Sequence, residues 1–554
     1  MKSIDTKYLP VTVADFEELR EYNKIYVDKT DLIYEFARDS YPCFLSRPRR
    51  FGKSLLLSTL KSLFEHGLEY FNGLKIKELW EDKTYPVLYL DFLHFSKNDF
   101  QQFKKDLYKD LKKFAIENNV KVDPDEKNNP LSLFDDICSD MNKKFVLLID
   151  EYDTQLSNNI DKQDKFEEFQ EFLYDFFTKT KSYLKKFRFV FITGVSRFSN
   201  TSIFSGINNL IDLSLKPYYG SLVGFTDKEL DFYFSDYLEN AAKVLEKSVE
   251  NLRIELKDYY DGYCFDPNLK IHVYNPWSIL NFLADPESKI IPYWSDSGFS
   301  SLVVNYFASY HKNPNAKHQF NPFLDCYEIE RAKLISSSNV KELKVEAFLY
   351  HAGYLTIKDV NASIYTLTTP NIEIRSYLSK SFIDDVLVAK NLIQKNYFDT
   401  AFYREICASL TQVNEDNIMS SFNKILNYIG YDAKIFYDEA SVRDVICIVL
   451  DKYDFAPIKF ADKITGSNIL TINREDPSAK GRSDIKFYFN NTTYVFELKV
   501  ARDGDNEEKL LESAVNQIKD RDYANDFIYT KLIRFALVEN ANKRSFTRCK
   551  VIEG

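Results

Sequence analysis

Glycine and proline are scarce in this chain, at 15 and 16 of 554 residues, and there are only seven cysteines. Long flexible linkers are built largely from glycine, serine and proline, so the composition argues against them. The cysteines are far apart, none forms a Cys-x-x-Cys pair, and none has a histidine at the spacing of zinc ligands. Disulfide scaffolds and zinc fingers are therefore excluded, and we expect reduced thiols in a cytoplasmic protein.

Long hydrophobic runs and an excess of positive charge are also missing. No run approaches the roughly 18 apolar residues of a membrane-spanning helix, and the polar start leads into no apolar segment. We therefore expect neither a signal peptide nor a membrane partner. The net charge of −10 argues against an overall basic surface that would bind nucleic acid. A chain with this net charge can still carry local basic patches. The six histidines show no catalytic-triad or metal-ligand spacing.

What is present fits a multidomain globular protein, with 45% hydrophobic and 16% aromatic residues. At about 150 residues per domain, the length predicts three or four domains. Shifts in pattern predict an α/β domain at residues 1–225, a mainly helical middle domain at 226–430 and a second α/β domain at 431–554. We find no internal repeat.

Apolar strand-like runs alternate with helical stretches in the first domain. The pattern predicts strands at 41–45, 87–91, 145–149 and 187–193. It predicts helices between them at 54–64 and 100–116. Strands separated by helices predict a parallel sheet with helices on both faces.

A candidate phosphate-binding loop lies between the first strand and the first of these helices. Such a loop needs backbone N–H groups at a helix N-terminus, a lysine for the β and γ phosphates, and a hydroxyl for Mg²⁺. The candidate residues are Arg50, Phe51, Gly52, Lys53 and Ser54. The usual first glycine is absent, because Arg47 takes its place. The alternative is a glycine-terminated turn before an ordinary helix.

The apolar run at 145–149 ends in Asp150 and Glu151. A buried strand at this point predicts that Asp150 joins Ser54 in the metal shell and that Glu151 acts on the attacking water. The strand at 87–91 is expected to lie between the strands that precede Lys53 and Asp150.

A fourth strand leads to Arg197. The polar end of this strand is expected to sense the γ-phosphate. Arg197 is expected either to stabilise charge on the phosphates or to form a surface ion pair, and the sequence leaves both open.

A second constellation lies near the end of the chain. Cleavage of phosphodiesters with Mg²⁺ needs two or three carboxylates and a lysine near the attacking water. Asp484 and Glu497 supply the carboxylates, and Lys499 lies two residues after Glu497 on the same strand face. A hairpin turn at residues 490–491 is expected to bring Asp484 beside them. The alternative is an edge strand with a solvated charged face.

Three further residues extend this set. Glu475 lies upstream as a further metal carboxylate, Gln517 lies on a helix predicted at 507–523, and Glu439 lies on a helix predicted at 433–450. A last strand is predicted at 532–538.

Several motifs together resemble the AAA-ATPase-like domain of a large bacterial family. They lie at residues 26–30, 46–54, 150–153, 193–199, 260–263 and 273–277. Members of this family typically end in a PD-(D/E)XK nuclease domain, and Arg47 in place of the first loop glycine is the norm among them. The order of Asp484, Glu497-x-Lys499 and Gln517 is similar to that of the PD-(D/E)XK superfamily.

These observations predict an ATP-binding and ATP-hydrolysing protein with a C-terminal nuclease that uses Mg²⁺ or Mn²⁺. The expected partner is nucleic acid, with DNA favoured over RNA. The expected biological context is defence or mobile-element processing. The sequence leaves a homo-oligomer open. The alternative is a regulatory NTPase switch, whose C-terminal domain binds nucleic acid or a partner without cutting.

Overall fold

The computed structural model describes the following residues: 8–122, 129–159, 162–195, 207, 209–288, 290–294, 326–335, 344–381, 400–427, 439–451, 471–478, 481–489, 492–521 and 531–553. Contacts divide the chain into two compact units. The first comprises Met1–Pro314 with Cys326–Asn371, and the second Asn315–Asp325 with Ile372–Gly554. The three domains expected from the sequence, with limits near residues 225 and 430, stay a prediction.

A five-stranded parallel sheet forms the centre of the first unit, in the order β2-β3-β4-β1-β5. Its strands are β1 (Cys43–Ser46), β2 (Val87–Asp91), β3 (Phe145–Asp150), β4 (Phe187–Gly194) and β5 (Ile211–Asp212). Every side chain of β1, β3 and β4 is buried, as expected for parallel strands covered on both faces. The four predicted strands are confirmed.

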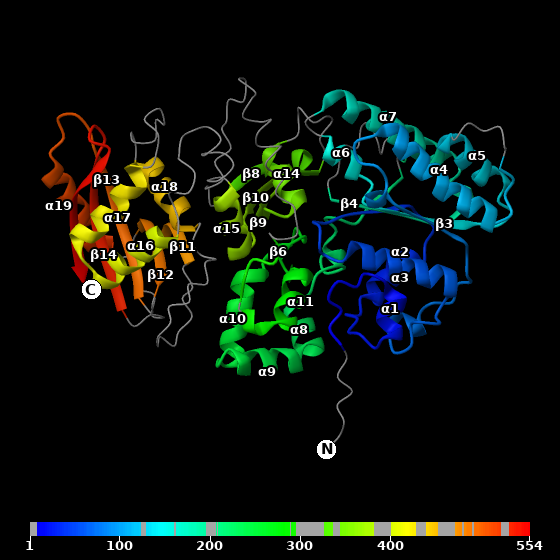
Figure 1. Cartoon of the computed structure of the whole chain (residues 1–554), viewed down its shortest axis with the longest axis horizontal. Coiled ribbons are helices and arrows are strands. Elements are labelled where there is room, and N and C mark those ends of the chain that lie inside the picture. The colour runs from blue at the N-terminus through cyan, green and yellow to red at the C-terminus, as the bar shows by residue number, and fades with distance from the viewer. Residues whose placement is uncertain are drawn as a thin grey trace, which may run out of the picture. The chain divides into compact units, whose positions relative to one another are not determined.

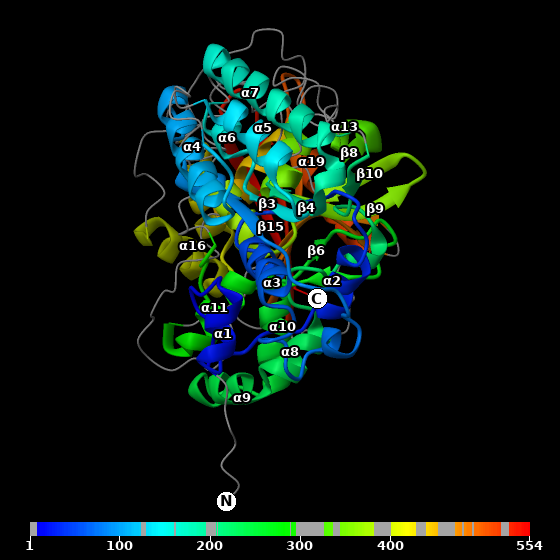
Figure 2. The same cartoon turned by 90° about the vertical axis from the view of Figure 1, so that its right-hand side faces the viewer.

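Helices cover both faces of this sheet. Figure 1 shows α4, α5 and α7 on one side and α1, α2 and α3 on the other, and Figure 2 shows the same layers after a quarter turn. The bounds are α1 (Phe16–Glu21), α2 (Thr30–Ala37), α3 (Lys53–His66), α4 (Phe100–Glu117), α5 (Pro130–Asp140), α6 (Thr154–Asn158) and α7 (Gln163–Ser182). Both predicted helices are confirmed, as α3 and α4. Short 3-10 helices are η1 (Lys75–Glu78), η2 (Phe92–His94), η3 (Leu184–Lys186), η5 (Pro217–Tyr219) and η6 (Pro286–Ser288).

The strand order corrects one prediction. The strand at Val87–Asp91 was expected between the strands that precede Lys53 and Asp150, but β2 lies at the edge of the sheet, beside β3. β4 separates β1 from β3 instead and pairs with both. The strands of the two motifs are therefore non-adjacent, as expected, and the strand between them carries Thr193.

The rest of the first unit mixes helices with small sheets. The helices are α8 (Asp227–Tyr233), α9 (Ser235–Val244), α10 (Val249–Tyr260), α11 (Pro276–Ala284), α13 (Arg331–Ile335) and α14 (Val345–Ala352). The strands are the pair β6 (Tyr263–Cys264) and β7 (His272–Val273), and the antiparallel sheet of β8 (Tyr327–Glu330), β10 (Ile364–Thr368) and β9 (Thr356–Asn361). α8 begins after Thr226, which forms a capping box with Glu229.

A mixed five-stranded sheet forms the centre of the second unit. Its strands follow chain order: β11 (Thr471–Ser478), β12 (Gly481–Phe489), β13 (Thr492–Ala501), β14 (Lys531–Asn540) and β15 (Ser545–Glu553). β13 and β14 are parallel, and the other neighbours are antiparallel. The predicted hairpin is confirmed by the pairing of Phe489 with Thr492, while its turn lies outside the described residues. The prediction that the strand at 532–538 is the last is wrong, because β15 follows β14.

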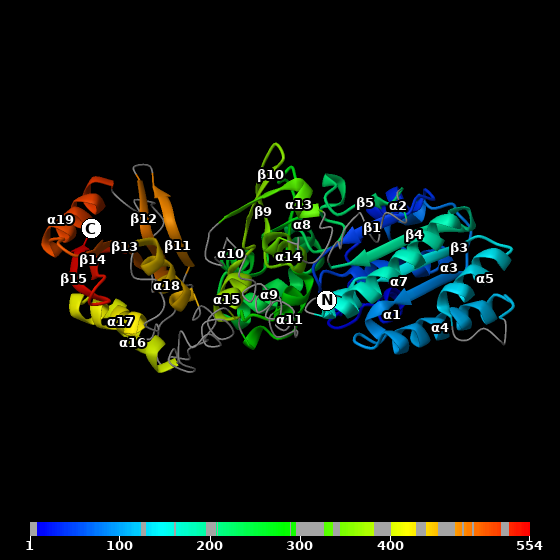
Figure 3. The ribbon, with the colours of Figure 1, turned by 90° about the horizontal axis from the view of Figure 1, so that it is seen from above.

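Helices cover both faces of this second sheet as well (Figure 3). They are α16 (Thr400–Gln412), α17 (Glu415–Asn427), α18 (Glu439–Asp451) and α19 (Glu507–Arg521). The same unit also contains α15 (Ile372–Ser381). Apolar side chains of α16, α17 and α18 pack on the face that carries Phe496 and Phe535. α19 packs through Ala514 and Ile518 on the opposite face, against Val495.

Glu539, near the end of β14, is a buried carboxyl. Its side chain is fully inaccessible, and neither carboxyl oxygen has a hydrogen-bond partner within the described residues. Burial raises the pKa of Glu539 to about 7, and Arg544 opposes this shift. The folded protein therefore holds a proton on Glu539 at pH values where the unfolded chain has released it.

We predict that Glu539 makes stability fall as the pH rises from about 4.5 to about 7, by at most about 3 kcal/mol. Its folded-state pKa lies above its unfolded value, so this loss is complete above pH 7. Glu539→Gln should therefore raise the melting temperature more at pH 8 than at pH 5. Thermal unfolding at the two pH values checks this, with the exposed Glu512→Gln on α19 as control. An equal shift at both pH values would contradict the prediction.

Within the described residues, no helix has the length and apolar character needed to cross a membrane. All seven cysteines are described, and none forms a disulfide, as the sequence predicts.

Candidate functional sites

The predicted phosphate loop connects β1 to α3. Gly52 precedes the helix with a φ of +97°, in the left-handed region that glycine adopts without a Cβ penalty. Lys53 and Ser54 begin α3, where the N–H groups of the first turn have no partner within the helix. Strand, loop and helix therefore have the arrangement that binds phosphate at a helix N-terminus.

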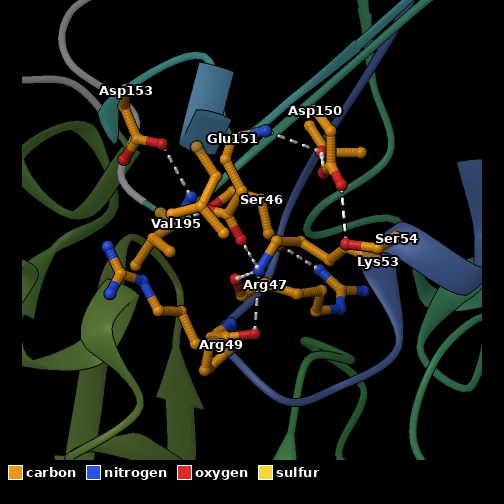
Figure 4. Close-up of polar contacts among 12 residues, drawn as sticks. Ser46, Arg47, Arg49, Lys53, Ser54, Asp150, Glu151, Asp153 and Val195 are labelled. Carbon is orange, nitrogen blue, oxygen red and sulfur yellow. Dashed lines mark hydrogen bonds and ion pairs between the residues drawn. The ribbon is translucent and has the colours of Figure 1, made fainter. Parts of the chain in front are cut away.

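The Lys53 side chain lies inside this loop (Figure 4). Its Nζ donates to the carbonyl oxygens of Arg47 at 3.0 Å and Pro48 at 3.1 Å. It also lies 3.1 Å from Oε1 of Glu151, and the lysine side chain is only 3% exposed. The phosphate loop and the acidic pair at the end of β3 are thus in direct contact, although Lys53 and Glu151 are 98 residues apart in the sequence.

Asp150 ends β3 and meets Ser54. The Ser54 hydroxyl donates to Oδ2 of Asp150 at 2.6 Å, and the Thr193 hydroxyl on β4 donates to Oδ1. Burial raises the pKa of Asp150 to about 6, and the neighbouring Glu151 adds to the shift. A divalent cation at this carboxylate would remove the cost of burying its charge, and a carboxylate with a hydroxyl is a donor set that Mg²⁺ takes. The residues present therefore fit the predicted metal.

Glu151 has an unusual backbone conformation. Its φ of +52° lies in the left-handed region, which non-glycine residues rarely adopt, and its N–H donates to Oγ1 of Thr193 at 3.4 Å. The carboxylate lines a cavity in front of the loop. Its Oε2 is buried and accepts no hydrogen bond from the described residues. Strain of this kind is typical of residues held for a functional role.

Arg47 has a structural reason to replace the usual glycine. Its guanidinium points away from the loop and donates to the carbonyl oxygens of Ser46, Ser214 and Tyr219, at 2.8, 2.7 and 3.1 Å. It also lies 4.2 Å above the ring of Phe265. Burial lowers the pKa of Arg47 to about 10. The arginine braces the back of the loop against the segment from β5 to η5 and against Phe265, which follows β6.

The cavity in front of the loop has a volume of about 360 Å³. Its polar lining comes mainly from the loop, the first residues of α3 and the residue that follows β3. These residues are Arg49, Arg50, Lys53, Ser54 and Glu151. Its apolar lining comes from segments before β1 and after β5, including Ile25, Val223, Phe225 and Trp277. A volume and lining of this type suit a small organic ligand with an anionic group.

Many lining residues were not among the predicted site residues, and Lys29 and Trp277 stand out among them. Lys29 pairs with Glu229 of the α8 capping box, and burial lowers the pKa of Lys29. Trp277 stands in the first turn of α11. Both lie in motifs at 26–30 and 273–277 that carry the family resemblance, which was the available signal. Arg197 lies outside the described residues, so its predicted role is unchanged.

The second set of predicted residues lies on the sheet of the second unit. Nζ of Lys499 lies 3.2 Å from Oε1 of Glu497 and 3.3 Å from Oε2 of Glu439, the first residue of α18. Oδ2 of Asp484 accepts a hydrogen bond from the Leu498 N–H at 2.8 Å. The hairpin therefore brings Asp484 to the segment that carries Glu497 and Lys499, as expected.

These groups share a partly buried environment. Burial raises the pKa of Asp484, while Lys499 opposes that shift. Burial alone would lower the pKa of Lys499, but the carboxylates of Glu497, Glu439 and Asp484 together raise it. Lys499 is thus a cation held among carboxylates, a combination that is unusual for a buried strand.

The predicted metal ligands are only partly described. Among the described side chains, no group of three His, Cys, Asp or Glu residues is placed to hold a metal ion. The backbone of Glu475 lies on β11, but its side chain lies outside the described residues, so the predicted set with Asp484 and Glu497 stays a prediction. Gln517 is half-buried on α19, which covers the face of β13 that carries Val495 and, two residues on, Glu497.

Comparison with known proteins gives two family matches. The family described as predicted AAA-ATPase matches residues 10–204, and the PD-(D/E)XK nuclease superfamily matches residues 463–548. The chain therefore joins an AAA-ATPase-like domain to a PD-(D/E)XK nuclease superfamily domain. A curated relative from Azotobacter chroococcum mcd 1, named "Uncharacterized protein in vnfD 5'region", is 28% identical over an alignment of 548 residues, and the match covers 94% of this chain and 94% of the relative.

The matches agree with the geometry. The AAA-ATPase-like domain contains the loop, Asp150 and Glu151, and the nuclease superfamily domain contains Asp484, Glu497 and Lys499. Domains of these families suggest, in general terms, ATPase and nuclease activity.

Proposed function

We propose that the AAA-ATPase-like domain binds and hydrolyses ATP. One observation carries this proposal: Lys53 contacts Glu151 in the lining of a cavity of about 360 Å³, beside the Ser54–Asp150 pair. Lys53 contacts the β and γ phosphates, together with the loop residues Arg50, Phe51 and Gly52. Ser54 and Asp150 hold Mg²⁺, which when bound neutralises phosphate charge.

Two side chains change partners when ATP binds in this proposal. Lys53 leaves the carbonyl oxygens of Arg47 and Pro48 for the phosphates, which are stronger partners for an ammonium group. Glu151 is then released from Lys53 and orients or deprotonates the attacking water. Arg197 stabilises charge on the phosphates.

We further infer that the C-terminal domain is a nuclease that acts on DNA with Mg²⁺ or Mn²⁺. The cation Lys499 among the carboxylates of Glu497 and Glu439, beside Asp484, supports this role. Asp484, Glu497 and Glu475 hold the metal, which supplies a Lewis acid for the phosphate. Lys499 orients the attacking water, and Gln517 faces the phosphate. Defence and mobile-element processing are the proposed contexts.

One prediction tests the nucleotide site. Lys53→Ala is expected to lose ATP binding, because a buried positive charge at the phosphates disappears. Isothermal titration calorimetry with ATP and Mg²⁺ checks this, with Lys61→Ala on the exposed side of α3 as the matched control. Equal binding of ATP by wild type and Lys53→Ala, or no binding by either, would show that the assignment of this loop as the nucleotide site is wrong.

The nuclease is tested with the purified chain on circular single-stranded and double-stranded DNA and on RNA. Mg²⁺ or Mn²⁺ is supplied, with and without ATP. Metal-dependent cutting supports the proposal. DNA binding without cutting under all conditions would instead favour a regulatory NTPase switch.

A further inference from the structure

Trp277 presents an aromatic ring to the cavity of the AAA-ATPase-like domain. The ring is held in place at its edge, because Nε1 donates to the carbonyl oxygen of Tyr293 at 3.2 Å. Its backbone is fixed by the helix cap, in which Oδ1 of Asn275 accepts from the Trp277 N–H at 2.9 Å. The tryptophan is thus oriented before any ligand binds.

Arg50 of the phosphate loop covers this ring. Its guanidinium carbon lies 4.2 Å from the ring centroid, and its φ of +67° is left-handed although it is not a glycine. Partial burial lowers the pKa of Arg50, and the neighbouring Arg49 adds to this effect. A loop cation therefore rests on an aromatic face in a strained backbone conformation.

The two parts of the cavity lining match the two parts of a nucleoside triphosphate. Arg50, Lys53 and the start of α3 suit the phosphates, whereas Ile25, Val223 and Trp277 suit a planar base. A phosphate forms charge-assisted hydrogen bonds with a guanidinium, and these exceed a cation–π contact in strength. Phosphates in the loop therefore compete with Trp277 for Arg50.

We propose that Trp277 is the residue on which the nucleotide base stacks, and that Arg50 covers its ring until phosphates draw the guanidinium into the loop. The proposal rests on the proposed ATP site and adds the element that recognises the base. It makes α11 part of the nucleotide site and couples its tryptophan to the occupancy of the loop.

The test compares ATP with inorganic tripolyphosphate, which has phosphates but no base. Binding of both to wild type, Trp277→Ala and Lys53→Ala is measured by calorimetry. Trp277→Ala should weaken ATP binding by about tenfold or more, as expected for one lost base–aromatic stack. Tripolyphosphate should bind this variant as well as wild type or more tightly, because Arg50 is released. Lys53→Ala should weaken both ligands.

Tryptophan fluorescence gives a second readout with a milder variant. ATP should change the tryptophan emission of wild type. It should also change the emission of the control variant Trp80→Phe, because Trp80 packs against Phe64 and does not line the cavity. The change should be smaller in Trp277→Phe, which keeps an aromatic face, and what is left is assigned to Trp294, whose Nε1 donates to the Arg49 carbonyl oxygen of the loop at 3.5 Å. Unchanged ATP affinity in Trp277→Ala, or an equal loss for ATP and tripolyphosphate, overturns the stacking role while ATP binding stands. A wild type that binds neither ligand overturns this inference and the proposed ATP site together.

Discussion

Glu151→Gln is expected to bind ATP at least as tightly as wild type and to hydrolyse it about 10²–10⁴-fold more slowly, the usual contribution of a general base. Binding should persist because Glu151 does not hold the phosphates. In the free protein its carboxylate competes for Lys53, at 3.1 Å, so a neutral glutamine makes Lys53 easier to transfer to ATP. Hydrolysis should fail because an amide cannot take a proton from water.

Calorimetry and single-turnover hydrolysis separate these two effects. The matched control is Glu246→Gln, since Glu246 is exposed and its φ of +53° is close to the +52° of Glu151. A glutamine in a left-handed backbone is thereby tested away from the site. Wild-type turnover in Glu151→Gln would show that Glu151 does not activate the attacking water. Asp153, or a residue outside this strand, would then be the candidate for that role.

The core elements of both domains could be predicted from local pattern. β2, β3 and β4 are runs of apolar residues that only a covered parallel sheet accommodates, and their predicted bounds agree with the structure within about a residue. The order of these strands could not be predicted, because it depends on which crossovers pack best and not on any one strand. Hence β2 was placed between the motif strands, a position that β4 occupies.

The strands that were missed have weaker local signals. β11 contains Pro477 and three consecutive charged residues at 474–476, and β15 alternates basic with apolar residues over 548–551. Such segments become strands because neighbouring strands offer hydrogen bonds to them. β15, for example, pairs with β14 over most of its length.

Residues with a chemical signature were predicted, whereas those that act through packing were not. Lys53, Asp150, Glu151, Asp484, Glu497 and Lys499 were predicted because their residue types and spacing are those that phosphate binding and metal-dependent cleavage require. The sequence shows Arg47 in place of the loop glycine, but the bracing role of Arg47 depends on Ser214, Tyr219 and Phe265, which lie far away in sequence. Trp277 is likewise one aromatic residue among many until the fold sets it beside the loop.

For the nuclease domain, Lys499→Ala is expected to keep metal and DNA binding and to lose cleavage. The structure places Nζ of Lys499 within 3.3 Å of two carboxylates, and the proposed role of this cation is to orient the attacking water and not to hold the metal. Asp484→Ala should lose metal affinity as well as cleavage, since it removes a proposed ligand. The exposed Lys509→Ala on α19 is the matched control for loss of a lysine.

Three measurements distinguish the outcomes: metal binding by calorimetry, DNA binding by fluorescence anisotropy in Ca²⁺, and cleavage of circular DNA in Mg²⁺ or Mn²⁺. Loss of the Lys499 cation removes a partner of Glu497 and Glu439, so metal affinity in Lys499→Ala should stay the same or rise. A fall in metal affinity would mean that Lys499 is needed to hold the carboxylates in place. Cutting that persists with chelator, or full activity in Lys499→Ala, would leave this domain as a nucleic-acid binding module, because the chemistry assigned to the hairpin would then reside elsewhere.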